Sequence, residues 1–260
     1  MDSFSELVIL DARSAEAYEA GHLDGAQHAD LETQLSDARV NDDPAHGGRH
    51  PLPPLEKWLH QVEAWGIGPS TRVVVYDDQD GANAAARAWW MLKAIGHENV
   101  EVLTNWREAS LPRPEPGPAD NQQPATRNTV SWRLPTVNMQ QVHQLRLDPA
   151  WRVLDVRAAP RFRGQTEPID PVAGHIPGAI NLPFAENLEG GAFKNPGVLR
   201  SMYEELLGDV PPERLVVHCG SGVTACHTLL ALDQAGLRGA SLYVGSWGEW
   251  CRNAMPIATE

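Results

Sequence analysis

The chain has 260 residues, with 34 acidic and 21 basic side chains and a formal net charge of −13. This acidity disfavours nonspecific binding to nucleic acids or anionic membranes, and no apolar run approaches the roughly 18 residues that span a bilayer. A hydrophobic content of 42% is enough for a packed core, which excludes a disordered chain.

The pattern of apolar runs in residues 1–110 predicts a first domain of alternating strands and helices. Apolar runs in LVILDAR, RVVVY and VEVL have the length of buried strands, and residues 85–95 predict a helix that ends at Gly96. This order predicts an α/β fold, a mostly parallel sheet flanked by helices on both faces.

Residues 111–130 predict a linker. Five prolines and few apolar residues lie between Leu111 and Asn128, a composition that favours an extended, semi-rigid connection over a packed core. The second domain is therefore expected at 131–260.

Residues 131–260 repeat the first domain. WRVLDVR corresponds to LVILDAR, and AGHIPGAINLPF corresponds to AGHLDGAQHADL. The predicted strand and helix of 214–236 correspond to those of 72–96. The blocks keep their order and nearly their spacing, so the chain is predicted to be a tandem of two homologous domains.

The second domain carries a cysteine where a strand meets a helix. Cys219 opens the loop CGSGVT, whose two glycines allow several backbone N–H groups to point toward one place. Together with the positive end of the following helix, this loop would stabilise a thiolate or a persulfide anion. The alternative is a buried cysteine in a purely structural turn. The first domain has Asp77 at the same position, so it is predicted not to carry sulfur.

Two other chemistries fit this loop less well. GSGVTA matches the dinucleotide-binding pattern G-x-G-x-x-A, but the next strand, SLYVGSW, lacks the acidic residue that binds a ribose. A cysteine phosphatase needs an arginine after five intervening residues, where this chain has Ala225. The loop therefore favours sulfur chemistry.

The Asp-x-Arg runs, the paired G-H-[IL]-x-G-A segments and the cysteine loop resemble the tandem-domain rhodanese family over nearly the whole chain. CGSGVTAC, together with GSWGEW, is similar to the 3-mercaptopyruvate sulfurtransferases of that family. The resemblance implies transfer of sulfane sulfur from 3-mercaptopyruvate to cyanide or to a thiol such as thioredoxin, through a persulfide on Cys219. It implies no metal and no organic cofactor. A thiosulfate sulfurtransferase and a non-enzymatic sulfur-relay module are the alternatives.

The same resemblance assigns the site residues. Ser221 is expected to move a proton together with His50 of GGRHPLPP and Glu32 of GAQHADLE, where the family usually has Asp. The donor carboxylate is expected to bind Arg161 of PRFRG, and a second arginine of animal members has no counterpart in TEPIDPVAG. The loop residues expected to line the substrate site are Gly220, Gly222, Val223 and Thr224.

Other charged and thiol residues receive structural interpretations. Arg13 and Arg157 occur in both repeats and are predicted to form ion pairs that support the fold. Cys226 is predicted to be core, and Cys251 is a candidate for an exposed thiol with a redox role left open. Three cysteines are too few for a disulfide scaffold and lack zinc-ligand spacing, so a reducing cytoplasm is the expected location.

Overall fold

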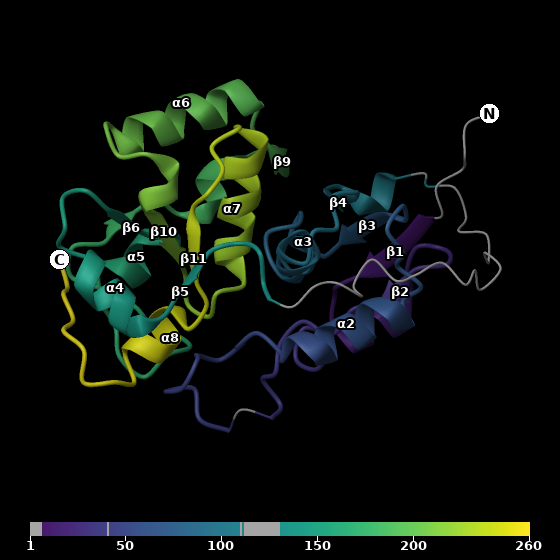
Figure 1. The fold of residues 1–260 in the computed structure, drawn as a ribbon, viewed down its shortest axis with the longest axis horizontal. Helices are drawn as coiled ribbons and strands as arrows, with labels where there is room; N and C mark the ends of the chain where they lie inside the picture. Colours follow the sequence, from purple (N-terminus) through teal and green to yellow (C-terminus); the bar gives the residue numbers. More distant parts are fainter. Residues whose placement is uncertain (1–6, 41, 110, 112–130) are drawn as a thin grey trace. The chain divides into compact units, whose positions relative to one another are not determined.

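The structure is a computed structural model that describes residues 7–40, 42–109, 111 and 131–260. The chain forms two compact units (Figure 1), of which unit 1 contains the described residues of Met1–Asp37 and Leu52–Arg133. Unit 2 contains those of Ala38–Pro51 and Leu134–Glu260. The predicted linker at 111–130 lies almost wholly outside the described residues, and the expected domain boundaries stay a prediction.

Unit 1 is built on a parallel sheet with the strand order β2-β1-β3-β4. The strands are β1 (Leu7–Asp11), β2 (Gln27–His28), β3 (Arg72–Tyr76) and β4 (Val100–Leu103). The helices are α1 (Ala15–Ala20), α2 (Leu55–Ala64), α3 (Ala84–Ala94) and the 3-10 turn η1 (Trp106–Glu108). Helix α3 contacts β3 and β4 and is buried at every position but Lys93, because its alanines allow close approach to the sheet.

Unit 2 is built on a parallel sheet with the order β5-β11-β10-β6-β7. Its strands are β5 (Thr136–Val137), β6 (Arg152–Asp155), β7 (Ile180–Asn181), β10 (Leu215–His218) and β11 (Ser241–Tyr243), with a small antiparallel pair, β8 (Leu188–Glu189) and β9 (Ala192–Phe193). Its helices are α4 (Met139–Leu145), α5 (Ala159–Phe162), α6 (Pro196–Leu207), α7 (Thr224–Gln234) and α8 (Ser246–Trp250), with 3-10 turns η2 (Phe184–Asn187) and η3 (Pro212–Arg214).

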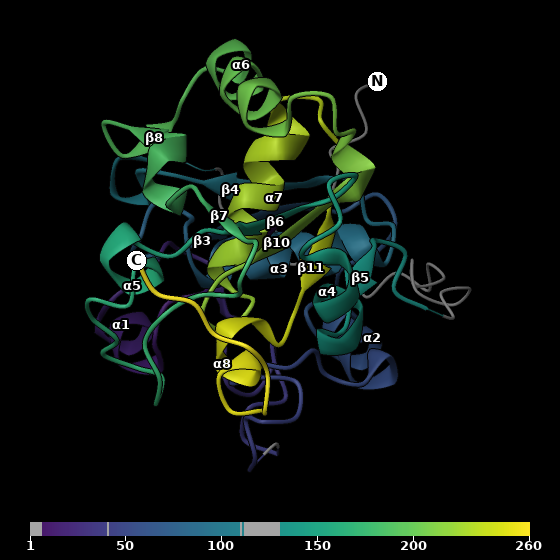
Figure 2. The ribbon, with the colours of Figure 1, turned by 90° about the vertical axis from the view of Figure 1, so that its left-hand side faces the viewer.

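Both faces of the unit 2 sheet are covered. In Figures 1 and 2, α6 and α7 lie on one side of the strands, and α4 and α8 lie on the other. On the α4 and α8 side the core contains Val142, Val153, Val216, Tyr243, Trp247 and Trp250. Burial of each such side chain contributes about 2 kcal/mol to folding. The predicted α/β architecture with parallel sheets is confirmed. Among the described residues, none of the helices has the length and apolarity to cross a bilayer.

The two sheets confirm the internal repeat. Strands β2-β1-β3-β4 of unit 1 correspond in order to β7-β6-β10-β11 of unit 2. Asp11 lies opposite Tyr76 and Asp155 lies opposite His218. The next residue along β3 and β10 is therefore Asp77 in one unit and Cys219 in the other.

The Asp-x-Arg motif of unit 1 forms an ion pair that also binds the chain after α1. The Arg13 guanidinium binds the Asp11 carboxylate through Nε and Nη2, and Nη2 also donates to the carbonyl oxygen of Gly21 at 2.6 Å. Its Cζ lies 4.3 Å from the ring centroid of Trp106. The ion pair therefore joins the end of β1 to the Gly-His segment that follows it.

Unit 2 repeats this arrangement. Arg157 binds Asp155 in the same way, donates from Nη2 to the carbonyl oxygen of Gly174 at 2.7 Å, and lies 4.7 Å from the ring centroid of Trp247. The side chains of Arg157 and Asp155 are 1% and 0% exposed. The prediction that both arginines form structural ion pairs is confirmed.

His227 is a buried titratable group away from these motifs. It lies on α7, its ring stacks on Phe193 at 4.5 Å between centroids, and Phe184 meets it edge-on at 5.9 Å. Burial lowers the pKa of His227 to about 3. The neutral imidazole is therefore the form that fits this core.

We expect the stability of the protein to fall as the pH drops from about 6.5 toward 3. In this window the unfolded chain binds a proton at His227 and the folded chain does not, so the free energy of unfolding rises with pH. His227→Leu should reduce that slope by up to about 1.4 kcal/mol per pH unit. Urea unfolding at several pH values measures the slope, and an unchanged slope in the variant would contradict the prediction.

Candidate active site

Cys219 lies at the carboxyl end of β10, in the loop that leads into α7. Its side chain is almost fully buried, with 3% of the residue exposed. Gly222 in the same loop has a φ of +74°, and a Cβ atom there would clash with the carbonyl oxygen of Val244. The tight loop therefore requires glycine at this position. Helix α7 begins at Thr224 and turns its N-terminus toward this loop, a place that favours negative charge.

The start of α8 holds the backbone of the cysteine. Ser246 Oγ accepts a hydrogen bond from the N–H of Cys219 at 3.2 Å. The N–H of Trp247 donates to the carbonyl oxygen of Cys219 at 3.0 Å, and the N–H of Gly248 donates to that of Gly220 at 2.9 Å. The cysteine loop is thus held by a second element of unit 2.

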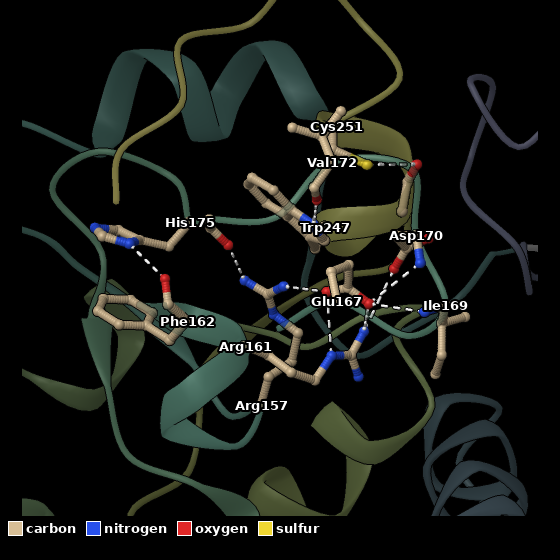
Figure 3. A network of polar contacts seen from close by, with 12 residues as sticks. Arg157, Arg161, Phe162, Glu167, Ile169, Asp170, Val172, His175, Trp247 and Cys251 are labelled. Atoms are coloured by element: carbon tan, nitrogen blue, oxygen red, sulfur yellow. Dashed lines mark hydrogen bonds and ion pairs between the residues drawn. The ribbon is translucent and has the colours of Figure 1, made fainter. Parts of the chain in front are cut away.

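A network of arginines and carboxylates lies beside the loop, and Figure 3 shows the part of it that contains Arg157, Arg161, Glu167 and Asp170. Arg161 on α5 binds Glu167 through two bonds, Nε to Oε2 at 3.1 Å and Nη2 to Oε1 at 2.6 Å. Arg157 Nη1 donates to Glu167 Oε2 at 3.2 Å. Burial acts to raise the pKa of Glu167, but its bonds to Arg161 and to backbone N–H groups outweigh burial and lower it. Glu167 is therefore an ionised anchor that orients Arg161.

Asp170 is the second anchor of this network, and its side chain is fully buried. Its Oδ1 accepts from Arg252 Nη1 at 2.7 Å and from Arg49 Nε at 3.2 Å. Arg161 Nη2 lies 3.6 Å from Oδ2. One buried carboxylate thus collects three guanidinium groups from separate parts of the sequence.

Two of these guanidinium groups approach the cysteine loop. A Cβ atom added to Gly220 would lie 2.9 Å from Arg49 Nη2 and 3.5 Å from Arg161 Nη2. Glycine after the cysteine therefore leaves room for both cations.

The pKa of Arg157 is raised. Burial acts to lower this pKa, but the charge of Asp155, with contributions from Glu167 and Cys219, acts more strongly in the opposite direction.

The charges of this network leave one positive charge in excess. The guanidinium groups of Arg49, Arg157, Arg161 and Arg252 face the carboxylates of Asp155, Glu167 and Asp170. An anionic sulfur at Cys219 would balance this excess. The arrangement suits a thiolate, a persulfide and an anionic donor.

Arg49 reaches this site because residues 42–51, the docked segment, belong to unit 2. The N–H of Gly47 donates to Glu249 Oε1 at 2.9 Å, and Asn253 Nδ2 donates to the carbonyl oxygen of Ala45 at 2.9 Å. Both partners lie in or just after α8. The docked segment is thus recognised through its backbone.

The backbone of the docked segment packs closely against the rest of unit 2 where Gly48 meets Gly245. Gly48 is buried with a φ of +80°, and a Cβ atom on it would overlap the carbonyl oxygen of Gly245. His50 and Arg49, which follow, are half-buried. Only glycine allows this approach, which sets where the two side chains begin.

The matching loop of unit 1 contains an anion of its own. The Asp77 carboxylate accepts bonds from the N–H groups of Gln79, Gly81, Asn83 and Ala85 at 2.9–3.1 Å. Burial raises the pKa of Asp77, although these four bonds act in the opposite direction. The fold therefore directs loop N–H groups at acceptor oxygens of the residue that corresponds to Cys219.

The predicted site residues fall into two groups. Unit 2 holds Cys219, Ser221, Arg161, His50 and the four loop residues, and the loop is buried apart from a half-exposed Thr224. Glu32 is half-buried in a turn of unit 1. The joint action of Ser221, His50 and Glu32 stays a prediction.

Sequence reasoning missed five residues of this site. They are Arg49, Glu167, Asp170, Ser246 and Arg252. Arg49 stands beside His50 in GGRHPLPP, so its neighbour was a signal for it. Asp170, Ser246 and Arg252 became visible only through contacts distant in sequence, and Glu167 through its bonds to Arg161 and Arg157, six and ten positions away.

The expectation of an exposed thiol at Cys251 is wrong. Cys251 is 7% exposed and packs in the cluster that contains Trp247 and Trp250, and burial raises its pKa. Cys226 is fully buried on α7, where its thiol donates to the carbonyl oxygen of Gly222, so its assignment to the core is confirmed. Among the described residues, no cluster of three or more His, Cys, Asp or Glu is suited to hold a metal.

Comparisons with known proteins agree with this architecture. A family model of the rhodanese-like domain matches residues 2–105 and 138–253. A protein of Pseudomonas aeruginosa named "Probable 3-mercaptopyruvate sulfurtransferase" is 41% identical over 98% of this chain and 93% of its own length. A thiosulfate sulfurtransferase of Gallus gallus is 35% identical over 79% of this chain and 72% of its own. The structure is similar to that of a 3-mercaptopyruvate sulfurtransferase from Leishmania major, with a TM-score of 0.75, 28% identity and coverage of 95% and 70%.

Gly48→Ala should loosen the docked segment, and Gly66→Ala is its matched control. Both glycines have a positive φ, +80° and +73°, but nothing lies within 4 Å of a Cβ atom on Gly66. Gly66→Ala should lose about 1–2 kcal/mol of stability from the left-handed backbone alone, and Gly48→Ala should lose more because of the added overlap with Gly245. Only Gly48→Ala should speed amide hydrogen exchange in residues 42–51. Equal exchange rates in the two variants would refute the close packing.

Proposed function

The chain belongs to the family of rhodanese-like domains, and we propose that it is a sulfurtransferase that takes sulfane sulfur from 3-mercaptopyruvate. Cys219 carries the sulfur as a persulfide and passes it to cyanide or to a thiol such as thioredoxin. The catalytic chemistry belongs to unit 2, because unit 1 has Asp77 in place of the cysteine.

The observation that carries this proposal is the pair of guanidinium groups at the cysteine loop. Arg161 Nη2 and Arg49 Nη2 both approach Gly220, the residue next to the nucleophile. Glu167 occupies the Nε and Nη2 side of Arg161, and Asp170 binds Arg49 Nε, so a donor carboxylate would bind the N–H groups that these contacts leave available. The carboxylate of 3-mercaptopyruvate, held there, would bring its sulfur to the loop that carries Cys219. Arg49 thus fills the role of the second cation that TEPIDPVAG lacks.

The first half-reaction transfers sulfur to the enzyme. The Cys219 thiolate attacks the donor sulfur, the carbon–sulfur bond breaks, and its electron pair stays on carbon as the enolate of pyruvate. The enolate takes up the proton that the donor thiol carried, so pyruvate leaves and the enzyme keeps a persulfide anion. The excess positive charge of the arginine network and the N-terminus of α7 stabilise that anion.

The second half-reaction returns the enzyme to its starting state. The acceptor attacks the outer sulfur of the persulfide, the sulfur–sulfur bond breaks, and Cys219 leaves as a thiolate that is again stabilised by the loop. Cyanide becomes thiocyanate and a thiol becomes its persulfide. Two half-reactions through a covalent intermediate predict ping-pong kinetics.

Ser221, His50 and Glu32 are the residues proposed to manage the proton of the first half-reaction. Ser221 stands two positions after the nucleophile and is 7% exposed. His50 follows Arg49 in the docked segment, which unit 2 holds. An imidazole can pass a proton to the enolate, and a carboxylate can fix its tautomer.

Thiosulfate is the second candidate donor. The two arginines at Gly220 would attract a sulfonate as well as a carboxylate, and the relatives include enzymes named for each activity. The cytoplasm is the proposed location, because all three cysteines are free thiols.

The donor is tested by incubating the protein with 3-mercaptopyruvate or with thiosulfate. We expect 3-mercaptopyruvate to add one sulfur atom to the intact mass and to release pyruvate, and to do so faster than thiosulfate. Cys219→Ser should stay unmodified because the nucleophile is gone. Faster loading by thiosulfate would assign the second activity, and no loading by either donor would leave a sulfur-relay module that is charged by a partner protein.

Arg49→Gln should raise the KM for 3-mercaptopyruvate about ten- to a hundredfold, since a charge-assisted hydrogen bond to the carboxylate is lost. Arg252→Gln is the matched control: it removes a guanidinium from the same Asp170 carboxylate, but one that donates to the carbonyl oxygen of Gly248. Steady-state kinetics of both variants measure the difference. Equal changes in KM would contradict a role of Arg49 in donor binding.

A further inference from the structure

Ser246 adopts a backbone conformation that few residues other than glycine adopt. It is fully buried at the start of α8 and has a φ of +55°. A side chain in the left-handed region is strained, and glycine would relieve that strain. A serine in this conformation indicates that its hydroxyl makes contacts that offset the strain.

The hydroxyl of Ser246 bridges a strand end and the nucleophile. It donates to the carbonyl oxygen of Tyr243 at 2.9 Å, at the end of β11. Its oxygen accepts the N–H of Cys219 at 3.2 Å. Since that N–H is buried, loss of the oxygen would leave the donor without its partner.

Together with its neighbour, Ser246 fixes both peptide planes around the nucleophile. The N–H of Cys219 belongs to the plane before its Cα atom, and this plane is held by Ser246 Oγ. The carbonyl of Cys219 belongs to the plane after it, which is held by the N–H of Trp247 at 3.0 Å. With the backbone restrained on both sides of the Cα atom, the sulfur position varies mainly by rotation about the Cα–Cβ bond.

Unit 1 provides an internal comparison. Asn105 precedes Trp106 as Ser246 precedes Trp247, and its φ is +51°. In the described part of unit 1, no hydrogen bond joins the Asn105 side chain to Asp77. The left-handed turn is therefore common to both repeats, whereas the bond to the loop residue belongs to the repeat with the thiol.

We propose that Ser246 is a positioning residue for Cys219: its hydroxyl fixes the backbone of the nucleophile so that the sulfur meets the donor. This inference rests on the proposed function of Cys219 as the sulfur carrier. It assigns a role to a serine other than Ser221, one that contacts neither donor nor sulfur.

The test compares Ser246→Gly, Ser246→Ala and Asn105→Gly. The glycine variants relieve strain, whereas the alanine variant keeps the strain and loses the hydroxyl. We expect Ser246→Gly and Ser246→Ala to load sulfur from 3-mercaptopyruvate about tenfold more slowly than the unaltered protein, although their thermal stabilities differ. Asn105→Gly should load sulfur at the unaltered rate.

Alkylation of Cys219 by iodoacetamide, followed across pH by peptide mass, is the second readout and needs no donor. Both Ser246 variants should shift this pH profile and Asn105→Gly should not. Unaltered loading and an unaltered profile in Ser246→Gly would overturn the proposal, as would an equal loss in Asn105→Gly. If the unaltered protein accepts sulfur from neither donor, the proposed function fails, and the alkylation profiles still decide the positioning role.

Discussion

The site in unit 2 depends on the buried guanidinium of Arg157. It binds Asp155 at the end of β6, reaches Glu167, and lies over the ring of Trp247. Trp247 in turn donates to the carbonyl oxygen of Cys219. A buried charge that loses its partner costs roughly 3–5 kcal/mol, so loss of Asp155 or Glu167 would disturb Arg157 and the tryptophan packed on it. The position of the nucleophile is thus tied to an ion pair that does not touch the reacting sulfur.

Much of the fold was predictable because the sequence contains two homologous repeats. The apolar runs of β1, β3, β6 and β10 end in motifs that recur in both halves. A residue that occurs in both repeats is expected to support the fold, whereas one that occurs in a single repeat is a candidate for the chemistry. Arg13 and Arg157 were assigned to the fold on this ground, and their ion pairs confirm it. Cys219 was assigned to chemistry because a loop with two glycines follows it between a strand and a helix, and the structure places it in a tight loop before α7. Its counterpart Asp77 was the ground for predicting that the first domain does not carry sulfur.

The rest of the site was not predictable, because it depends on contacts between distant residues. The resemblance assigned His50 of GGRHPLPP to the site, but it did not show that the arginine beside it binds Asp170 across 121 positions. The carboxylates of Glu167 and Asp170 look like ordinary surface charges in sequence. Cys251 was misjudged because its nearness to the C-terminus suggested exposure, whereas tryptophans of α8 bury it.

The loop of unit 1 is constrained by its own hydrogen bonds, although it has no thiol. Its four N–H groups converge on the Asp77 carboxylate, and a neutral aliphatic side chain there would leave buried donors without acceptors. In unit 1 these N–H groups therefore meet a built-in acceptor, the carboxylate of the chain itself, where unit 2 has a thiol. Position 77 is constrained by the hydrogen bonds that it must satisfy, independently of any sulfur chemistry.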